Sequence, residues 1–155
     1  MAEENSQASS SSKMVTLKAS DDALFEVELN IAQEMKTVQV YIDDSEDIEI
    51  IPIPNVSGKH LAIIIEYIKK QSKESDADFG KEWSLDDMME LLLAANYLEL
   101  SSLLQCLCQA IADRIKNKSP EFVRKVFNVE NDYSPEEEAE LRKEVAWAFE
   151  GVDRD

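Results

Sequence analysis

The chain has 155 residues, of which 44% are hydrophobic, so it can bury the core of one domain with an appendage. Its 33 acidic and 16 basic residues give a formal net charge of −17, and such a field repels phosphate backbones and anionic membranes. The composition therefore argues against nucleic-acid and membrane partners. It is consistent with a solvated surface or with a basic partner.

The first stretch, residues 1–13, is rich in Ser and acidic, and it lacks the apolar centre of a secretory signal. We predict a disordered tail there. No run of about 18 apolar residues occurs in the chain, so the sequence predicts no transmembrane span.

Alternating apolar residues then predict a short hairpin, with Val15 and Leu17 in one strand, residues 25–29 in the other, and a turn at 20–22. Asn30 is a candidate N-cap for a helix that starts at the next residue. The following residues 37–42 are β-branched and alternate with period two, so the local pattern alone predicts a strand.

An acidic loop at 43–47 lacks the Gly and the terminal Glu that a calcium-binding loop requires. Residues 48–53 read as a strand, which Pro52 and Pro54 restrict to an edge or exit position. Ser57 can cap the helix that follows, and His60, the only histidine, is interpreted as a surface residue rather than a catalytic one.

Residues 71–82 are polar and predict a loop. Ser84 then marks the start of a helix over 85–98, with Trp83 and Met88 as a hydrophobic staple. That helix is apolar on nearly every side, which is typical of a helix buried all round. A second helix over 103–115 has a clear apolar period.

The only two cysteines, Cys106 and Cys108, lie two positions apart, so on a helix they point in nearly opposite directions. They cannot hold one metal together or form a disulfide with each other there. Read as two buried thiols, they suit a reducing compartment.

Two short helices are predicted near the C-terminus. Ser119 and Pro120 mark the start of one over 120–127, which carries more apolar surface than so short an element can bury. After a turn at 131–133, Ser134 caps the second. Trp147 lies off its apolar stripe, so either the last turn unwinds or Trp147 faces something else. Trp147 is therefore a candidate binding residue, and the alternative, that its ring folds back on its own domain, stays open.

The sequence contains no glycine-rich phosphate loop, no dinucleotide fingerprint and no zinc-binding spacing of His or Cys. Carboxylates are plentiful, but no two of them are distinguished as an acid–base pair. We therefore predict no catalytic residue, no metal site and no cofactor, and we do not expect an enzyme.

Several segments, in order along the chain, carry a family resemblance. They are Ile53-Pro54-Asn55-Val56, Ala94-Ala95-Asn96-Tyr97-Leu98, residues 108–115, Lys116-x-Lys118-Ser119-Pro120-Glu121, Phe127-Asn128-Val129-x-Asn131-Asp132-Tyr133, Glu136-Glu137-Glu138 and Trp147. Over residues 15–150 the chain resembles the S-phase-kinase-associated adaptors of SCF ubiquitin ligases, and its ending at 147–150 resembles the plant branch.

The resemblance implies an α+β fold, with a BTB/POZ-like domain of three strands and helices and a C-terminal helical extension. It divides the chain into a tail at 1–13, a cullin-binding domain at 14–118, an F-box-binding extension at 119–150 and a tail at 151–155. It also implies that residues 37–42 are helical, against the local pattern, because tertiary context can override propensity.

Site residues follow from the same resemblance. For the cullin scaffold the implied contacts are Asn96 and Tyr97. For F-box proteins the predicted set is Ile111, Ala112, Ile115, Phe122, Val123, Phe127, Val129 and Trp147. Within this set Phe122 departs from the family, which often has Glu there, and Val40-Tyr41 departs from it close to the expected cullin side.

The sequence thus predicts a non-catalytic adaptor that bridges F-box receptors to a cullin in an SCF-type ubiquitin ligase, in the nucleus and the cytoplasm. Two alternatives stay open: a BTB-like module that self-associates or binds F-box or other partners outside a cullin ligase, and an acidic chaperone of basic proteins. Salt-sensitive binding to basic chains would favour the chaperone, because exposed charges are screened within about 10 Å at 0.1 M salt.

Overall fold

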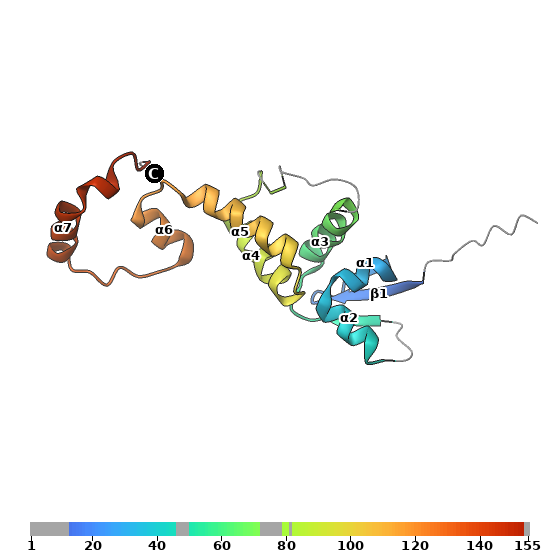
Figure 1. Ribbon diagram of the computed structural model, residues 1–155. Helices are drawn as coiled ribbons and strands as arrows, with labels where there is room; N and C mark the ends of the chain where they lie inside the picture. The colour runs from blue at the N-terminus through green and yellow to red at the C-terminus, as the bar shows by residue number, and fades with distance from the viewer. Residues whose placement is uncertain (1–12, 46–49, 72–78, 81, 154–155) are drawn as a thin grey trace, which may run out of the picture. The chain divides into compact units, whose positions relative to one another are not determined.

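The structure, a computed structural model, describes residues 13–45, 50–71, 79–80 and 82–153 (Figure 1). It divides into two compact units: unit 1 comprises residues 1–77 and 93–103, and unit 2 comprises residues 78–92 and 104–155. The predicted tail at 1–13 falls almost wholly outside the described residues, and the predicted boundary at 118–119 stays a prediction.

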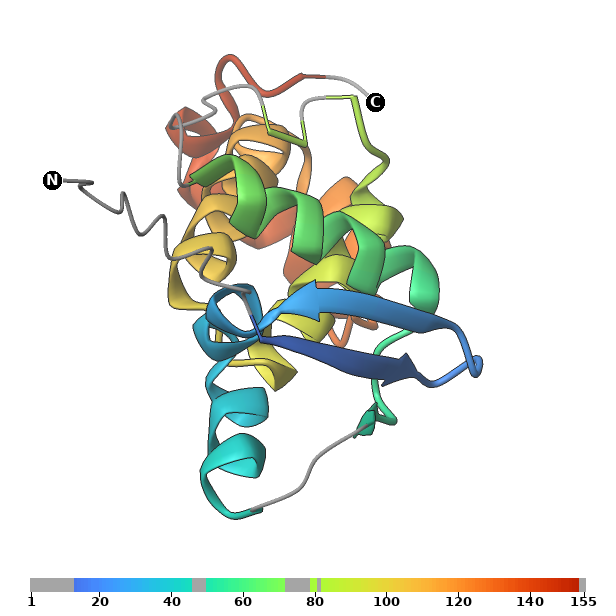
Figure 2. The same cartoon turned by 90° about the vertical axis from the view of Figure 1, so that its right-hand side faces the viewer.

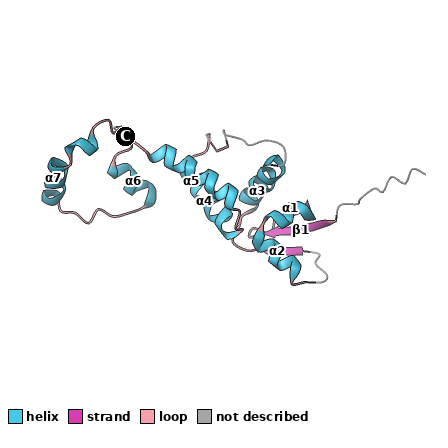
Figure 3. Ribbon diagram, viewed as in Figure 1, coloured by secondary structure: helices cyan, strands magenta, loops and turns pink. Residues whose placement is uncertain are grey.

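Strands and helices are both present, which confirms the predicted α+β class (Figure 3). The elements are β1 (Met14–Ala19), β2 (Leu24–Glu28), α1 (Leu29–Glu34), α2 (Lys36–Asp43), β3 (Ile50–Ile53), α3 (Gly58–Gln71), α4 (Leu85–Tyr97), α5 (Ser101–Ile115), α6 (Pro120–Phe127), α7 (Pro135–Glu144) and the 3-10 helix η1 (Ala146–Phe149).

Unit 1 is built on a three-stranded sheet with the order β2-β1-β3. The antiparallel hairpin of β1 and β2, in blue in Figure 2, pairs Leu17 with Phe25, and β3 runs parallel to β1 with Leu17 opposite Ile51. β3 therefore forms an edge of the sheet, the position that its proline predicts. One face of the sheet is buried, through Val15, Leu17, Ala19, Val27, Ile51 and Ile53.

The hairpin turn also fixes the start of α3. Asp22 adopts a left-handed conformation with φ 64°, and the carboxylate of Asp21 accepts from the backbone N–H of Gly58 at 3.1 Å through each oxygen. A side chain at position 58 would bring its Cβ within 2.8 Å of the Ala23 Cβ, so glycine is required. The negative charge lies at the helix N-terminus, where the helix dipole favours it.

The second half of the hairpin ends earlier than predicted, because Leu29 is the first residue of α1. The N-cap is Glu28, without a side-chain hydrogen bond, so the prediction of Asn30 as the cap is wrong. The N–H of Leu29 donates to the carbonyl of Lys13 at 2.8 Å, which satisfies one of the open donors that a capping side chain would otherwise serve.

Residues 37–42 lie in the helix α2, so the strand that the local pattern predicts is wrong and the helix that the resemblance implies is correct. The burial explains the outcome. Met35 and Val38 are fully buried and Ile42 is half-buried, with the spacing of three and four of a helix face, whereas Val40 and Tyr41 are exposed. Packing on the core therefore selects the helix over β propensity.

The helices that follow α2 agree with their sequence signals. The hydroxyl of Ser57 accepts from the backbone N–H of His60 at 3.5 Å at the start of α3, and that of Ser84 accepts from the N–H of Asp87 at 3.1 Å at the start of α4. Most of the predicted loop at 71–82 lies outside the described residues. In unit 2 the buried side chains of these helices are Met88, Leu91, Leu107 and Ile111.

Candidate functional site

The C-terminal extension, residues 119–150, carries helices that bury none of their residues. None of α6, α7 and η1 contains a buried residue, although α6 includes two Phe and two Val. Phe127 is 41% exposed, Val129 57% and Trp147 73%. Apolar side chains of this size are the usual anchors of a protein–protein interface.

Helix α6 begins and ends through local chemistry. The Ser119 hydroxyl accepts from the N–H of Phe122 at 3.1 Å, Pro120 occupies the first turn, and Asn128 closes the helix in a left-handed conformation with φ 52°. The ammonium of Lys118 lies 5.5 Å from the ring centroid of Phe122. Phe122 and its neighbour Val123 are both half-buried.

Helix α7 starts at Ser134, the predicted cap, and the structure adds a capping box formed with Glu137. The Ser134 hydroxyl accepts from the N–H of Glu137 at 3.2 Å, and the Ser134 N–H donates to the Glu137 carboxylate at 2.9 Å. The helix ends at Val145, where φ −116° and ψ 36° leave the α-helical region. The last turn thus unwinds into η1, as one of the two predictions stated, and Trp147 is exposed rather than folded back.

The capping box makes α7 sensitive to pH. The backbone N–H of Ser134, and then its hydroxyl, hold the pKa of Glu137 below its usual 4.5. Since the pKa is lowered in the folded chain, the stabilisation is present above the unfolded pKa and is lost as pH falls through the folded pKa. We expect the Ser134 amide proton shift to titrate with a midpoint below 4.5.

The matched variant for this titration is Glu137→Gln, which keeps an acceptor oxygen but cannot ionise. NMR titration should give a flat Ser134 amide shift in this variant. A Gln variant that titrates like the wild type, or a wild-type midpoint above 4.5, would contradict the assignment.

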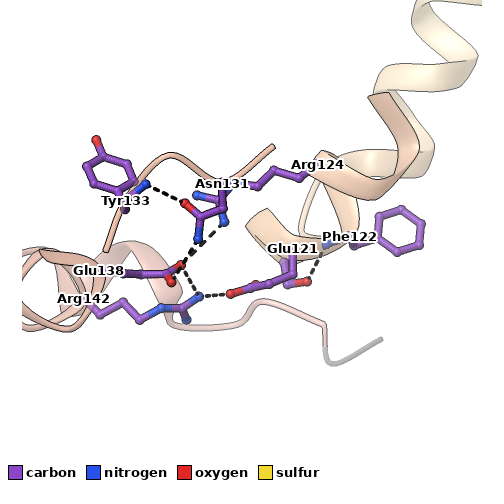
Figure 4. A network of polar contacts seen from close by, with 8 residues as sticks. Glu121, Phe122, Arg124, Asn131, Tyr133, Glu138 and Arg142 are labelled. Carbon is purple, nitrogen blue, oxygen red and sulfur yellow. Dashed lines mark hydrogen bonds and ion pairs between the residues drawn. The ribbon is translucent and has the colours of Figure 1, made fainter. Parts of the chain in front are cut away.

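Polar side chains form an ion-pair cluster that joins α6, α7 and the loop between them, comprising Glu121, Arg124, Asn131, Glu138 and Arg142 (Figure 4). The Glu138 carboxylate accepts from Asn131 Nδ2 at 3.2 Å and lies 3.5 Å from Nη1 of Arg124 and from Nη2 of Arg142. Desolvation acts to raise the pKa of Glu138, but the hydrogen bonds from Asn131 and Arg142 and the charges of both arginines outweigh it, so the pKa is lowered.

A residue that follows the extension contacts the two residues that precede it. Lys118 forms a β-bridge with Asp153, the N–H of Asp153 donates to the Asn117 carbonyl at 2.7 Å, and the Lys118 ammonium lies 3.7 Å from the Asp153 carboxylate. These contacts therefore bring the two ends of the segment 118–153 together.

The three candidate residues on α5 differ in exposure. Ala112 is exposed and Ile115 is half-buried, but Ile111 is buried at 6% exposure. The buried line of α5 runs through Leu103, Leu107 and Ile111, one residue in four. Ala112 and Ile115 are thus accessible on the helix that leads into the extension, whereas Ile111 belongs mainly to the core.

Unit 1 presents the two residues predicted for the cullin scaffold at the end of α4. Asn96 is exposed and Tyr97 is half-buried. The hydroxyl of Thr37, in the first turn of α2, donates to the backbone carbonyl of Tyr97 at 2.6 Å. This bond joins α2 to the C-terminal end of α4 through the backbone of Tyr97, and the Tyr97 side chain takes no part in it.

Sequence reasoning missed Leu93, one turn before Asn96, because it predicted a helix buried all round. Leu93 is 68% exposed, so that prediction is wrong for one face of α4. On α2, Val40 is 60% exposed and Tyr41 43%, at the positions where the sequence departs from the family. A signal was available in the position of Leu93 three residues before the polar Asn96, which places both on one helix face.

Side chains with nucleophilic or ligating potential are dispersed. Cys106 is half-buried and Cys108 is exposed, so the prediction of two buried thiols is wrong. Nδ1 of the half-buried His60 lies 2.9 Å from the hydroxyl of Ser57, the residue that caps α3. Within the described ranges, no three His, Cys, Asp or Glu side chains gather closely enough to hold a metal ion.

Among the described helices, none combines the length and apolarity needed to span a membrane.

A small three-stranded sheet with helices, followed by helices that leave large apolar side chains exposed, is the architecture of a protein-interaction module rather than of a catalytic pocket. Residues 13–73 match the Skp1 family tetramerisation domain and residues 101–148 match the Skp1 family dimerisation domain. The chain belongs to the Skp1 family, whose members are the adaptors of SCF-type ubiquitin ligases.

Plant relatives support the same family assignment. The chain is 45% identical to SKP1-like protein 14 of Arabidopsis thaliana over 148 residues, covering 90% of this chain and 99% of the relative. It is 43% identical to SKP1-like protein 16 of the same plant over 168 residues, covering 92% and 99%. It is 41% identical to SKP1-like protein 1 of Oryza sativa subsp. japonica over 167 residues, covering 89% and 96%.

These matches confirm the resemblance to the plant branch, the POZ-like assignment of the N-terminal part and the SCF adaptor role. Membership of the family implies binding to F-box proteins and to a cullin. The individual contact residues stay predictions.

Proposed function

We propose that this chain is a non-catalytic bridge between F-box receptors and a cullin, and that its two binding surfaces are separate. The extension, with Ala112 and Ile115 of α5, receives the F-box motif. The end of α4, with Asn96 and Tyr97, receives the cullin. The observation that carries the proposal is the group of apolar side chains on an extension whose helices bury no residue.

The F-box contact draws its affinity from a few anchors. Phe127, Val129 and Trp147 are each more than 40% exposed. Full burial of such a side chain contributes roughly 1.5–3 kcal/mol, and a partner gains the share that corresponds to the part still exposed. Part of this gain is offset by the ordering of both partners on association. We therefore expect a few side chains, Trp147 above all, to carry most of the affinity.

Reconstitution from purified components tests the proposal directly. The chain, an Arabidopsis thaliana F-box protein and a cullin should coelute as a ternary complex, and the F-box protein and the cullin should not coelute without the chain. Binary complexes in the absence of a ternary one would contradict the bridging role, since the two surfaces would then compete.

The non-catalytic part of the proposal has its own test. As an adaptor without catalysis, the chain should form no thioester with ubiquitin, although the thiol of Cys108 on α5 is exposed. The measurement is a gel-shift assay with ubiquitin, its activating enzyme and a conjugating enzyme, with and without reductant. A reductant-sensitive adduct that disappears in Cys108→Ser would contradict the adaptor role without catalysis.

The proposal also covers the classes of partner and the location of the protein in the cell. A net charge of −17 disfavours nucleic acid and anionic membranes as ligands, so both partners of the chain are proteins. We place the protein in the nucleus and the cytoplasm, and fluorescent tagging in plant cells tests this distribution.

A further inference from the structure

The Arg142 side chain lies where three elements of the extension meet. Its guanidinium donates through Nη2 to the Glu121 carboxylate of α6 and, at 3.5 Å, to the Glu138 carboxylate one turn earlier in α7 (Figure 4). Its Cζ also lies 4.8 Å from the ring centroid of Phe149 in η1. A guanidinium can bind carboxylates in its plane and stack on a ring with its face, so one side chain joins α6, α7 and η1.

Two of these elements carry candidate anchors of the F-box contact. Phe127 ends α6 and Trp147 lies in η1, while Val129 follows α6 in the loop. Since α6, α7 and η1 contain no buried residue, close apolar packing does not fix the place of Trp147 relative to Phe127. The contacts of Arg142 join α6 to η1 in place of such packing.

The cluster also holds the connecting loop. Glu138, which accepts from Arg142, accepts as well from Asn131 and pairs with Arg124 of α6. Asn131 in turn accepts through Oδ1 from the N–H of Tyr133 at 3.2 Å. Arg124 and Glu138 are each only 25% exposed, so this pairing is better shielded from solvent than an isolated surface ion pair.

We infer that Arg142 is a positioning residue of the F-box-binding surface. Before the partner binds, Arg142 holds η1, which contains Trp147, in a fixed place relative to α6. The inference rests on the proposed function, because it concerns the same surface. Arranging the anchors in advance lowers the ordering cost of binding and so raises the affinity. Arg142 acts through η1 and α6 rather than by contact with the partner.

The chain offers a matched pair of variants. Arg142→Met removes the charge and the stacking group, and Lys143→Met removes the same charge from the next residue of α7, which is exposed. Calorimetric titration with a purified Arabidopsis thaliana F-box protein should show binding weaker by about five- to tenfold for Arg142→Met, the effect of losing about 1 kcal/mol of surface network. Lys143→Met should change binding by less than about twofold.

A readout in the free chain separates positioning from contact. Amide exchange of residues 146–149 should be faster in Arg142→Met than in the wild type and unchanged in Lys143→Met, because only the first releases η1. Arg142→Lys keeps the charge but loses the planar fork and most of the stacking, so it should fall between Arg142→Met and the wild type in both measurements.

Each result decides a different point. If Arg142→Met and Lys143→Met bind equally while the wild type binds well, the inference is overturned and the proposed function survives. If Arg142→Met binds weakly but exchanges like the wild type, Arg142 contacts the partner directly and the positioning role is overturned. If the wild type itself does not bind, the proposed function fails first.

Discussion

A chain that ends after Lys118 should lose F-box binding and keep cullin binding. Five of the eight predicted F-box residues lie beyond this point: Phe122, Val123, Phe127, Val129 and Trp147. If three or four of these side chains become buried, they contribute roughly 1.5–3 kcal/mol each before the ordering cost, so their removal leaves no measurable F-box affinity. The cullin candidates Asn96 and Tyr97 lie in unit 1 and are not removed.

Pull-down with each purified partner measures the loss of F-box binding and the retention of cullin binding, and retained cullin binding reports that unit 1 is still folded.

A point variant in the full chain tests the predicted anchors without removing the whole extension. Trp147→Ala should weaken F-box binding by about 2–4 kcal/mol, the usual cost of a central aromatic anchor. Tyr133→Ala is the matched control, since Tyr133 is an aromatic of the same extension that is 48% exposed and outside the predicted set.

Two outcomes would contradict this placement. One is a truncated chain that still holds F-box proteins. The other is a Tyr133→Ala variant that loses as much affinity as Trp147→Ala, because binding would then depend on the extension as a whole and not on its predicted anchors.

Where local chemistry decides the structure, the sequence predicted it well. Ser119 and Ser134 cap their helices as expected, because a hydroxyl needs only a backbone N–H three residues ahead. The position of Trp147 off the apolar stripe of α7 left two alternatives open, and the structure has the one in which the last turn unwinds, into η1. Both signals come from within a few residues.

Where tertiary packing decides, the local pattern failed. Residues 37–42 alternate like a strand, but packing buries Met35 and Val38 with helical spacing. In α4 the apolar composition predicted burial all round, and yet Leu93 is exposed. Composition gives the apolar surface of a helix but not whether its own chain or a partner covers it.

The site shows the same limit. Resemblance supplied seven of the eight F-box candidates, all but Phe122, but it could not distinguish the buried Ile111 from the accessible Ala112 and Ile115. Arg142 was missed altogether, because its contact with Glu121 spans 21 residues and no local pattern marks it. The sequence thus indicated candidate contact residues more readily than a long-range polar contact such as that of Arg142 with Glu121.

The double variant Asn96→Lys with Tyr97→Ala should abolish cullin capture while F-box capture survives. The two residues lie at the end of α4, where Asn96 is exposed and Tyr97 is half-buried. Removing an interface tyrosine and placing an unpaired charge beside it should cost at least about 2–3 kcal/mol, or roughly a hundredfold in affinity. Because Thr37 donates to the backbone carbonyl of Tyr97, the bond that joins α2 to α4 does not depend on the removed side chain.

Binding of the double variant to each partner by biolayer interferometry gives the result, with Trp147→Ala as the reciprocal control. The expected pattern is a double dissociation, in which one variant loses only the cullin and the other loses only the F-box protein. Equal loss of both partners in the double variant would indicate unfolding, and unchanged cullin binding would move that interface away from the end of α4. The side chains of Leu93, Val40 and Tyr41 would then be the next positions to substitute, because each belongs to unit 1 and is more than 40% exposed among the described residues.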